Sequence, residues 1–233
     1  MTGFPRYAIY YASACGSPLD RFGAQLLGYD AWTGEELPFP DAVVQTVPDW
    51  RRLTTDPRKY GFHATLKPPF ALANGKTETA LLFDCRQFAM AGRRIPVIRP
   101  RVDCISGFIA IIPAERSGEL DLLAKDCVSA FDHFRAELSE QERARRNPEE
   151  LTPRQLNYLD RWGYPYVMEE FRFHMTLTGR LDETRRPPVQ RMLHERFSAT
   201  GIENIEIDRI SLFRQDDVDA RFRIIGDWPL CAA

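Results

Sequence analysis

The sequence lacks the features that mark several classes of protein. Its five cysteines are odd in number and scattered, and none forms a C-x-x-C pair, so we predict reduced thiols in a cytoplasmic protein rather than a disulfide framework. No apolar run is long enough to span a bilayer. The 31 Lys and Arg residues nearly balance the 33 Asp and Glu residues, which gives a formal net charge of -2. Such a balance provides no general attraction to nucleic acid or to an anionic membrane, so any recognition of an anion must be local.

Histidine is also scarce, and no group of His, Cys and Asp residues has the spacing of a zinc site. We therefore predict no metal and no cofactor. Two of the four histidines, His63 and His174, share a pattern, whereas His133 and His194 are expected at the surface. A chain of 233 residues has room for one large domain or for two small lobes that share a core.

Apolar periodicity and turn residues predict strands and helices of an α+β fold. Strands are predicted at residues 6–12, 60–70, 98–106, 108–113, 169–180, 205–213 and 221–225, and helices at residues 18–27, 77–89, 117–138 and 188–199. The pair Pro68 and Pro69 is expected to end the second of these strands. Residues 139–163 are highly charged, and two capping boxes, which begin at Ser139 and Thr152, predict two short helices in an insertion.

Two of the predicted strands carry the same motif, His-x-Thr, as His63 with Thr65 and as His174 with Thr176. In a strand, residues i and i+2 project from the same face, about 6.6 Å apart along the chain. Each motif therefore presents an imidazole and a hydroxyl on one face, while the apolar residues beside them turn to a core. A single His-x-Thr is usually structural, but its repetition on two matched strands points to a site.

The paired motifs suit chemistry at phosphorus. Histidine titrates near neutral pH and acts as a general acid or base, and a threonine hydroxyl can donate a hydrogen bond to a phosphate oxygen. If the two strands lie side by side, the imidazoles can flank one phosphorus atom. One imidazole would then accept a proton from water or a hydroxyl, and the other would protonate the leaving oxygen, while the threonines hold the non-bridging oxygens.

Three further side chains are candidates for binding the substrate. Lys67 is predicted on the face of the first motif, and Arg172 on the face of the second, where each could neutralise a phosphate. Tyr60 lies just before the first motif and could reach the same cleft, as could its neighbours Arg58 and Lys59.

The motifs also carry a family resemblance. HATL at 63–66 and HMTL at 174–177 resemble the signature of the 2H phosphoesterase superfamily, which includes cyclic nucleotide phosphodiesterases and RNA 2′,5′-ligase-like proteins. The longer strings RKYGFHATLKPPF and EEFRFHMTLTGRL are similar to an uncharacterised bacterial branch that is often encoded beside phosphonate-utilisation genes. The resemblance implies one bilobal domain over residues 1–233, with two antiparallel sheets around a central cleft and helices on the outside. It implies no metal, and it implies catalytic roles for the four motif residues alone.

We therefore predict a cytoplasmic, metal-independent phosphoesterase for a small cyclic phosphate, such as a ribose cyclic phosphate left by cleavage of a carbon–phosphorus bond. Other functions stay open: RNA-end processing, a non-catalytic module that binds a phosphorylated ligand, and a structural partner in a phosphonate-processing complex. An RNA groove would draw on the arginines of the charged insertion, but glutamates interrupt that basic run, which favours a solvated helical face. The direction of the reaction, the division of roles between the histidines and the oligomeric state are left undetermined by the sequence.

Overall fold

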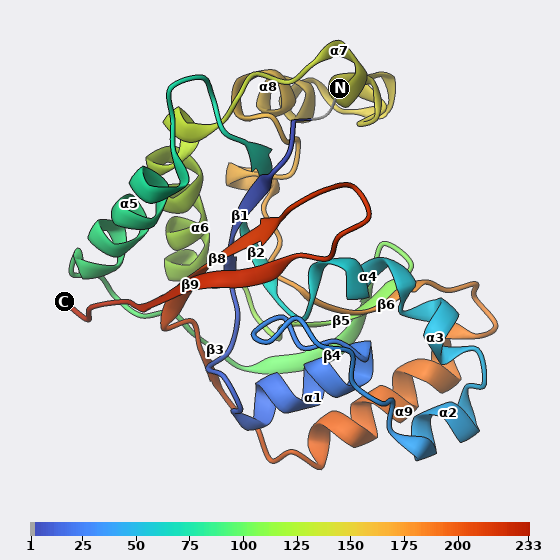
Figure 1. Ribbon diagram of the computed structural model, residues 1–233. Coiled ribbons are helices and arrows are strands. Elements are labelled where there is room, and N and C mark those ends of the chain that lie inside the picture. The colour runs from blue at the N-terminus through green and yellow to red at the C-terminus, as the bar shows by residue number, and fades with distance from the viewer. Residues whose placement is uncertain (1–2) are drawn as a thin grey trace.

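An antiparallel sheet organises the chain, and its strands follow the order β4-β5-β6-β2-β1-β8-β9 (Figure 1). The computed structural model describes residues 3–233. The strands of this sheet are β1 (Arg6–Tyr11), β2 (Ala64–Ala71), β4 (Pro100–Ile105), β5 (Phe108–Pro113), β6 (Met175–Arg180), β8 (Arg209–Gln215) and β9 (Arg223–Pro229). Two short strands, β3 (Val97–Ile98) and β7 (Ile205–Glu206), pair with each other. The predicted α+β fold with antiparallel sheets is confirmed.

The sheet consists of two halves that meet at one residue pair. β2 and β6 are joined only where Ala64 lies opposite Met175. On one side of this junction lie β1, β8 and β9, and on the other lie β4 and β5. The two sheets expected from the sequence are these two halves. The half that contains β2 takes strands from both ends of the chain, whereas β4, β5 and β6 all lie between Pro100 and Arg180.

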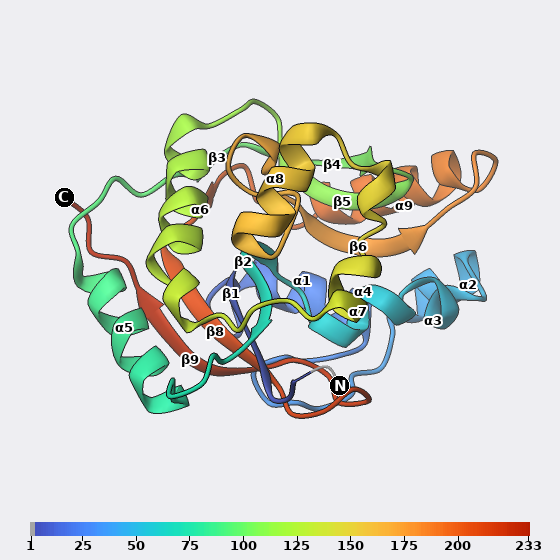
Figure 2. The same ribbon diagram turned by 90° about the horizontal axis from the view of Figure 1, so that it is seen from above.

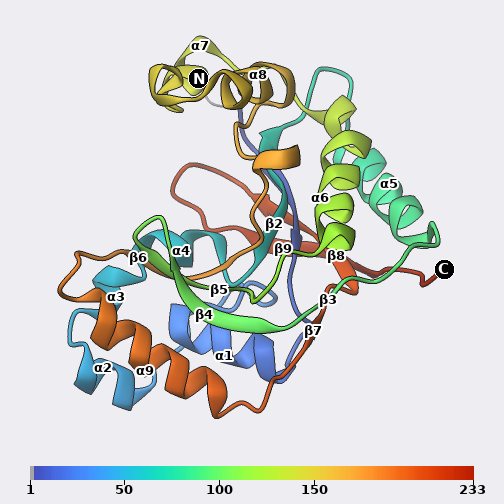
Figure 3. The ribbon, with the colours of Figure 1, turned by 180° about the vertical axis from the view of Figure 1, so that it is seen from behind.

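Four helices cover one face of the sheet, on its outer side in Figures 1 and 3. Helices α5 (Glu78–Met90) and α6 (Gly118–Ala130) pack on the half that contains β2, β8 and β9, and α1 (Pro18–Leu27) and α9 (Arg186–Ser198) pack on the half that contains β4, β5 and β6. Buried side chains from all four helices join one apolar core with the strands. The opposite face of the sheet carries a smaller cluster of buried apolar residues around Tyr10 and Phe213 and is otherwise free to form a site.

The remaining helices are short. They comprise α2 (Asp41–Thr46), α3 (Trp50–Leu53), α4 (Thr55–Tyr60), α7 (Glu140–Ala144) and α8 (Pro153–Trp162), with single turns of 3₁₀ helix at Asp132–Phe134, Pro148–Glu150 and Met168–Glu170. Both capping boxes predicted in the charged segment are present, at the starts of α7 and α8. Figure 2 shows these two helices above the sheet, and their description as an inserted unit stays a prediction. Among the described residues, no helix has the length and the apolar character needed to cross a membrane.

Several predicted boundaries are wrong. Pro68 and Pro69 do not end β2, because beyond Ala64 the strand has β1 on one edge only, and an edge strand tolerates residues that lack an N–H group. The helix predicted to residue 138 stops at Ala130, after which the chain turns so that Arg135 forms a backbone bridge with Leu72. The last predicted strands also shift, as residues 205–213 divide into β7 and β8 and β9 extends beyond residue 225.

The strand predicted over residues 169–180 begins only at Met175. Its pairing with β5 starts there, opposite Ile111, and residues 168–170 form a 3₁₀ turn instead. Each catalytic candidate histidine therefore stands one residue before its strand, since β2 likewise begins at Ala64.

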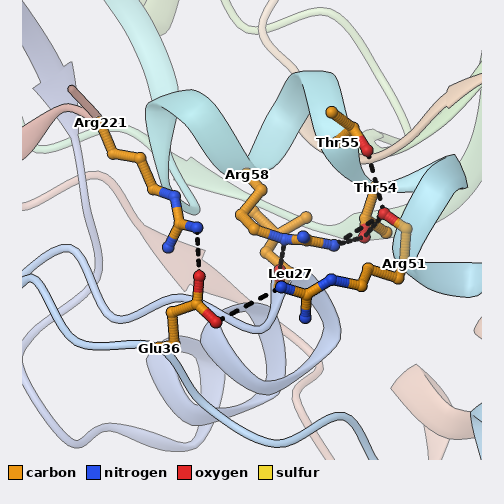
Figure 4. Close-up of polar contacts among 7 residues, drawn as sticks. All are labelled: Leu27, Glu36, Arg51, Thr54, Thr55, Arg58 and Arg221. Atoms are coloured by element: carbon orange, nitrogen blue, oxygen red, sulfur yellow. Dashed lines mark hydrogen bonds and ion pairs between the residues drawn. The ribbon is translucent and has the colours of Figure 1, made fainter. Parts of the chain in front are cut away.

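A buried arginine anchors the segment that leads into the first motif (Figure 4). Arg58 is 6% exposed, and its guanidinium donates hydrogen bonds to the Leu27 carbonyl at 2.6 Å, to the Arg51 carbonyl at 2.9 Å and to the Thr54 hydroxyl at 2.6 Å. The suggestion that Arg58 reaches the cleft is therefore wrong, because all three contacts lie within the scaffold. Arg58 instead fixes α4 against the last turn of α1 and so positions the following loop.

The contact between α1 and the first motif yields a test of packing. A Cβ atom on Gly23, inside α1, would lie 1.9 Å from the ring of Phe62, the residue before His63. We expect Gly23→Ala to lower the free energy of unfolding, because overpacking costs roughly 1–3 kcal/mol and exceeds the gain of about 1 kcal/mol in helix propensity. Urea denaturation measures the change. The matched control is Gly118→Ala in α6, where a Cβ would meet no atom within 4 Å, and equal stability of the two variants would contradict the prediction.

Candidate active site

The pairing of Ala64 with Met175 brings the two His-x-Thr motifs together. Both residues are fully buried and face the apolar core, so the motif residues beside them point to the opposite face of the sheet. Because the strands are antiparallel, extending this register by one residue places Thr65 beside His174 and Thr176 beside His63. The four side chains thus form a square with approximate twofold symmetry, in which neighbouring Cβ atoms of a sheet are typically about 4.5–5.5 Å apart.

The two histidines are held in the same way. The Nδ1 atom of His63 bonds to the Gly61 carbonyl at 2.9 Å, and that of His174 bonds to the Arg172 carbonyl at 2.7 Å. A carbonyl only accepts, so in each ring Nδ1 carries the proton and Nε2 keeps its lone pair. The Thr65 hydroxyl lies 3.3 Å from the free Nε2 of His63 and can donate to it. Both rings therefore present a proton-accepting nitrogen to the shared face.

Glycine at position 61 is required by this arrangement. Its φ of 74° lies in a region that favours glycine, and a Cβ atom there would approach the Cβ of Ala31 to 2.7 Å. The resulting turn directs the Gly61 carbonyl at His63. The backbone of the loop thereby fixes the orientation of the imidazole.

The environment keeps both imidazoles neutral. Burial lowers the pKa of His63 to about 4, against the hydrogen bond to Gly61, and the nearby His174 lowers it further. Burial also lowers the pKa of His174, although its bond to the Arg172 carbonyl acts in the opposite direction. A bound phosphate would reverse this tendency, because a negative charge beside an imidazole favours the protonated form.

Aromatic rings support the histidines. The ring of His63 stacks on Tyr10, with centroids 3.8 Å apart and an angle of 22° between the planes. Tyr10 itself is 1% exposed and belongs to the small apolar cluster on this face of the sheet. The ring of His174 lies against Phe108, with centroids 5.5 Å apart. Neither imidazole can tilt freely.

Two adjoining cavities open at the motifs. One, of about 300 Å³, is lined by His63, His174 and Thr176, and the other, of about 450 Å³, is lined by Thr65 and His174. Phe108, His174 and Arg180 line both, so the two form one continuous cleft. A small phosphorylated molecule fits this space.

Two of the three predicted substrate-binding residues lie at the cleft, and the third does not. Tyr60 lines the smaller cavity beside His63, and its ring centroid is 6.1 Å from that of the imidazole. Arg172 is exposed and lines the larger cavity. Lys67 does not face the histidines: it is 1% exposed, and its ammonium donates to the Val128 carbonyl and to Asp132, both at 3.1 Å.

The position of Lys67 has a local cause. Thr65 lies opposite Tyr10, whereas Lys67 lies opposite Ile9, so β2 has an extra residue, Leu66, at this point. Such a bulge interrupts the alternation of faces. Lys67 therefore turns toward α6 and the core side, and the prediction that it shares the face of His63 is wrong.

The sequence did not identify Phe108 and Arg180, which line the cleft, or Tyr10, which stacks on His63. Arg180 continues the alternation of β6 on the face of His174 and Thr176, so the period of two could have identified it. The stacking of Tyr10 and Phe108 against the histidines depends on cross-strand neighbours and left no local signal. Among the described residues, no group of three or more His, Cys, Asp or Glu side chains could hold a metal ion.

Comparisons with known proteins place the chain in a family. Residues 65–223 match the model of the family described as "Protein of unknown function (DUF1045)". Two curated proteins named ribose 1,5-bisphosphate phosphokinase PhnN are similar to it: that of Janthinobacterium sp. (strain Marseille) is 36% identical over 93% of this chain and 49% of its own length, and that of Laribacter hongkongensis (strain HLHK9) is 32% identical over 94% and 50%. The chain thus spans about half the length of the curated relatives it matches.

Solved structures are more distantly similar. A conserved protein of unknown function from Agrobacterium tumefaciens str. C58 is 14% identical with a TM-score of 0.45, over 95% of this chain and 85% of its own. LigT of E. coli, solved with NADP+, is 13% identical with a TM-score of 0.43, over 97% of this chain and 98% of its own. Another similar structure is named a phosphoesterase.

The lowered pKa of His63 is testable by titration. We expect its ring proton signals to shift with a midpoint near pH 4 in the free protein, followed by NMR and assigned with the His63→Gln variant. Between pH 6.5 and 4 the unfolded chain binds a proton that the folded protein does not, so the free energy of unfolding falls as pH falls through this window. In His63→Gln this fall is smaller. A midpoint at or above 6.5 in the wild type would contradict the burial argument.

Proposed function

This chain belongs to the DUF1045 family, and from that premise we propose that it is a metal-independent phosphoesterase that opens a small cyclic phosphate. The observation that carries the proposal is the matched pair of histidines, His63 and His174, set diagonally across the junction of the two half-sheets. Each offers a free Nε2 atom to the same cleft, and each stands next to a threonine hydroxyl. This is the arrangement that two linked proton transfers at one phosphorus require.

The proposed reaction uses two proton transfers, one from the attacking water to a histidine and one from the other histidine to the leaving oxygen. A water oxygen attacks phosphorus while its proton moves to the Nε2 atom of one neutral histidine. The bond from phosphorus to the ring oxygen breaks, and that oxygen takes a proton from the Nε2 atom of the other, protonated histidine. Thr65 and Thr176 hold the non-bridging oxygens, and Arg172 and Arg180 at the cleft balance their charge.

The two environments favour different roles. His63 is stacked on Tyr10, and its pKa of about 4 keeps it neutral, so we assign it the role of base. His174 acquires its proton when the anionic substrate binds beside it, and we assign it the role of acid. His174 is thus protonated only in the complex with the anionic phosphate, and it is neutral in the free protein.

A phosphorylated ribose is the proposed substrate class, and 5-phosphoribosyl 1,2-cyclic phosphate is the specific candidate. The name of the curated relatives includes ribose 1,5-bisphosphate, which supports a related sugar here. The resemblance to a branch encoded beside phosphonate genes points to the same chemistry. The name also describes a kinase, but this sequence contains no G-x-x-x-x-G-K-[S/T] loop to cradle a nucleoside triphosphate, so we do not extend kinase activity to it.

A nucleoside 2′,3′-cyclic phosphate is the second candidate substrate. Tyr164 and Tyr166 line the larger cavity and offer ring faces on which a base can stack. A longer RNA groove over the charged segment is less favoured, because Arg143 is paired with Asp160 and Arg154 with Glu170.

Removal of either imidazole tests the proposed chemistry. We expect His63→Ala and His174→Ala each to lower kcat for 5-phosphoribosyl 1,2-cyclic phosphate by about 10²–10⁴, because each removes one proton transfer. Phosphorus-31 NMR follows ring opening, and His194→Ala on the exposed side of α9 is the control. Tight binding of the compound by the wild type without turnover would instead favour a non-catalytic binding module.

The assignment of acid and base predicts a split between substrates. p-Nitrophenolate leaves phosphorus without needing a proton, so the loss of the acid is expected to matter little for bis(p-nitrophenyl) phosphate. His174→Ala should therefore keep most of its activity on this compound, while His63→Ala loses activity on both. Absorbance of the released nitrophenolate gives the rates. The opposite pattern would reverse the roles of the two histidines.

A further inference from the structure

We propose that the cavity between β2 and α7 is a second phosphate subsite, so that the preferred substrate carries another phosphate group besides the cyclic one. This inference rests on the proposed function and concerns the same cleft. The cavity has a volume of about 430 Å³ and is bounded by the start of β1, by β2 beyond its bulge and by the end of α7. Arg6 of β1 and Glu142 of α7 line it together, although they are far apart in sequence.

Cationic side chains line this cavity from both sides. They are Arg6, Lys67, Arg135, Arg145 and Arg146, and only two carboxylates, Glu137 and Glu142, accompany them. The concentration of positive charge is local, because the whole chain has a net charge of -2. A cavity with an excess of positive charge favours an anionic ligand.

Three of these cations are not neutralised. Lys67 and Arg135 share the carboxylate of Asp132. Among residues 3–233, Arg6, Arg145 and Arg146 form no ion pair.

Each of two free arginines is held by a neutral group. The side chain of Arg6 donates to the amide oxygen of Gln215, with Nε at 3.0 Å. Arg146 lies over the ring of Tyr164 at 4.9 Å. These contacts orient the guanidinium groups and leave their charge available to a phosphate.

The cavity adjoins the catalytic cleft. Tyr164, beneath Arg146, lines the larger cavity of the cleft, and Pro68 lines both spaces. The charges of Arg6 and Arg146 both act to lower the pKa of Tyr10, which burial nevertheless raises. Tyr10 is the ring on which His63 stacks, so both arginines lie near the base of the reaction.

The position of the arginine-lined cavity beside the cleft indicates the class of substrate. A compact molecule with a cyclic phosphate at one end and a phosphate monoester at the other can place the first between the histidines and the second among the arginines. A phosphorylated sugar and a 5′-phosphorylated nucleotide share this chemistry. A substrate without the second phosphate would lose the contacts to Arg6 and Arg146.

The test compares matched pairs of substrates. The ratio of kcat/KM values is measured for 5-phosphoribosyl 1,2-cyclic phosphate over ribose 1,2-cyclic phosphate, and for adenosine 2′,3′-cyclic phosphate with and without a 5′-phosphate. We expect the wild type to prefer the phosphorylated member of one pair, and we expect Arg6→Met/Arg146→Met to reduce that ratio by roughly 10- to 100-fold, because contacts to a charged group are lost. A fall in the ratio for the ribose pair identifies a sugar phosphate as the substrate class, and a fall for the adenosine pair identifies a 5′-phosphorylated nucleotide.

Arg143→Met is the matched control, since Arg143 belongs to α7 but is paired with Asp160 and does not line the cavity. It should keep the wild-type ratio. A wild-type ratio near one, or an equal fall in the double variant and in Arg143→Met, would overturn the subsite and leave the proposed chemistry intact.

If the wild type opens none of the four compounds, the proposed function fails, and calorimetric binding of ribose 5-phosphate decides on the subsite alone. Binding lost in Arg6→Met/Arg146→Met and kept in Arg143→Met supports it. An absence of binding by the wild type, or binding that the double variant retains, overturns it.

Discussion

The candidate site depends on the single antiparallel contact between Ala64 and Met175. Both side chains are buried in the core, and this burial is what forces the neighbouring histidines and threonines onto the other face. No other residue pair joins β2 to β6. The candidate site therefore lies at the point where two half-sheets meet, and each half supplies one imidazole and one hydroxyl. The two rings are held by equivalent contacts, since each Nδ1 atom bonds to the carbonyl two residues before its histidine.

The centre of the cleft is neutral, whereas its surroundings are positively charged. Burial makes an imidazolium without a counter-ion costly, so the candidate site holds two neutral rings and two available lone pairs. Arginines surround this neutral centre: Arg172 and Arg180 lie at the cleft, and others lie across the adjoining cavity. In the proposed reaction, an anionic substrate meets this positive charge first and then favours protonation of a histidine. Binding and activation are in this way linked by one electrostatic effect.

The sequence predicted the features that local chemistry determines. The motifs of His63 and His174, the helix caps and most of the strands follow from periodicity and from residue types over short stretches. Features that depend on distant partners could not be predicted in the same way. Lys67 changes faces because a bulge forms against β1, and the proline pair stays in β2 because the other edge of that strand has no partner. The stacking of Tyr10 on His63 and the anchoring of Arg58 likewise arise from contacts made only in the folded chain.

The distribution of the strands along the chain has a consequence for how the protein is made. β4, β5 and β6 lie between Pro100 and Arg180, whereas the other half joins β1 and β2, from residues 6–71, to β8 and β9, from residues 209–229. The half that contains β2 is therefore not encoded by a continuous stretch of sequence, and it cannot be completed during synthesis until β8 and β9 have been made. Pairings between such distant segments form slowly, since long loops must close first. The candidate site at the edge of this half should therefore be among the last parts of the molecule to assemble, and the protein is a poor subject for division into separately expressed fragments.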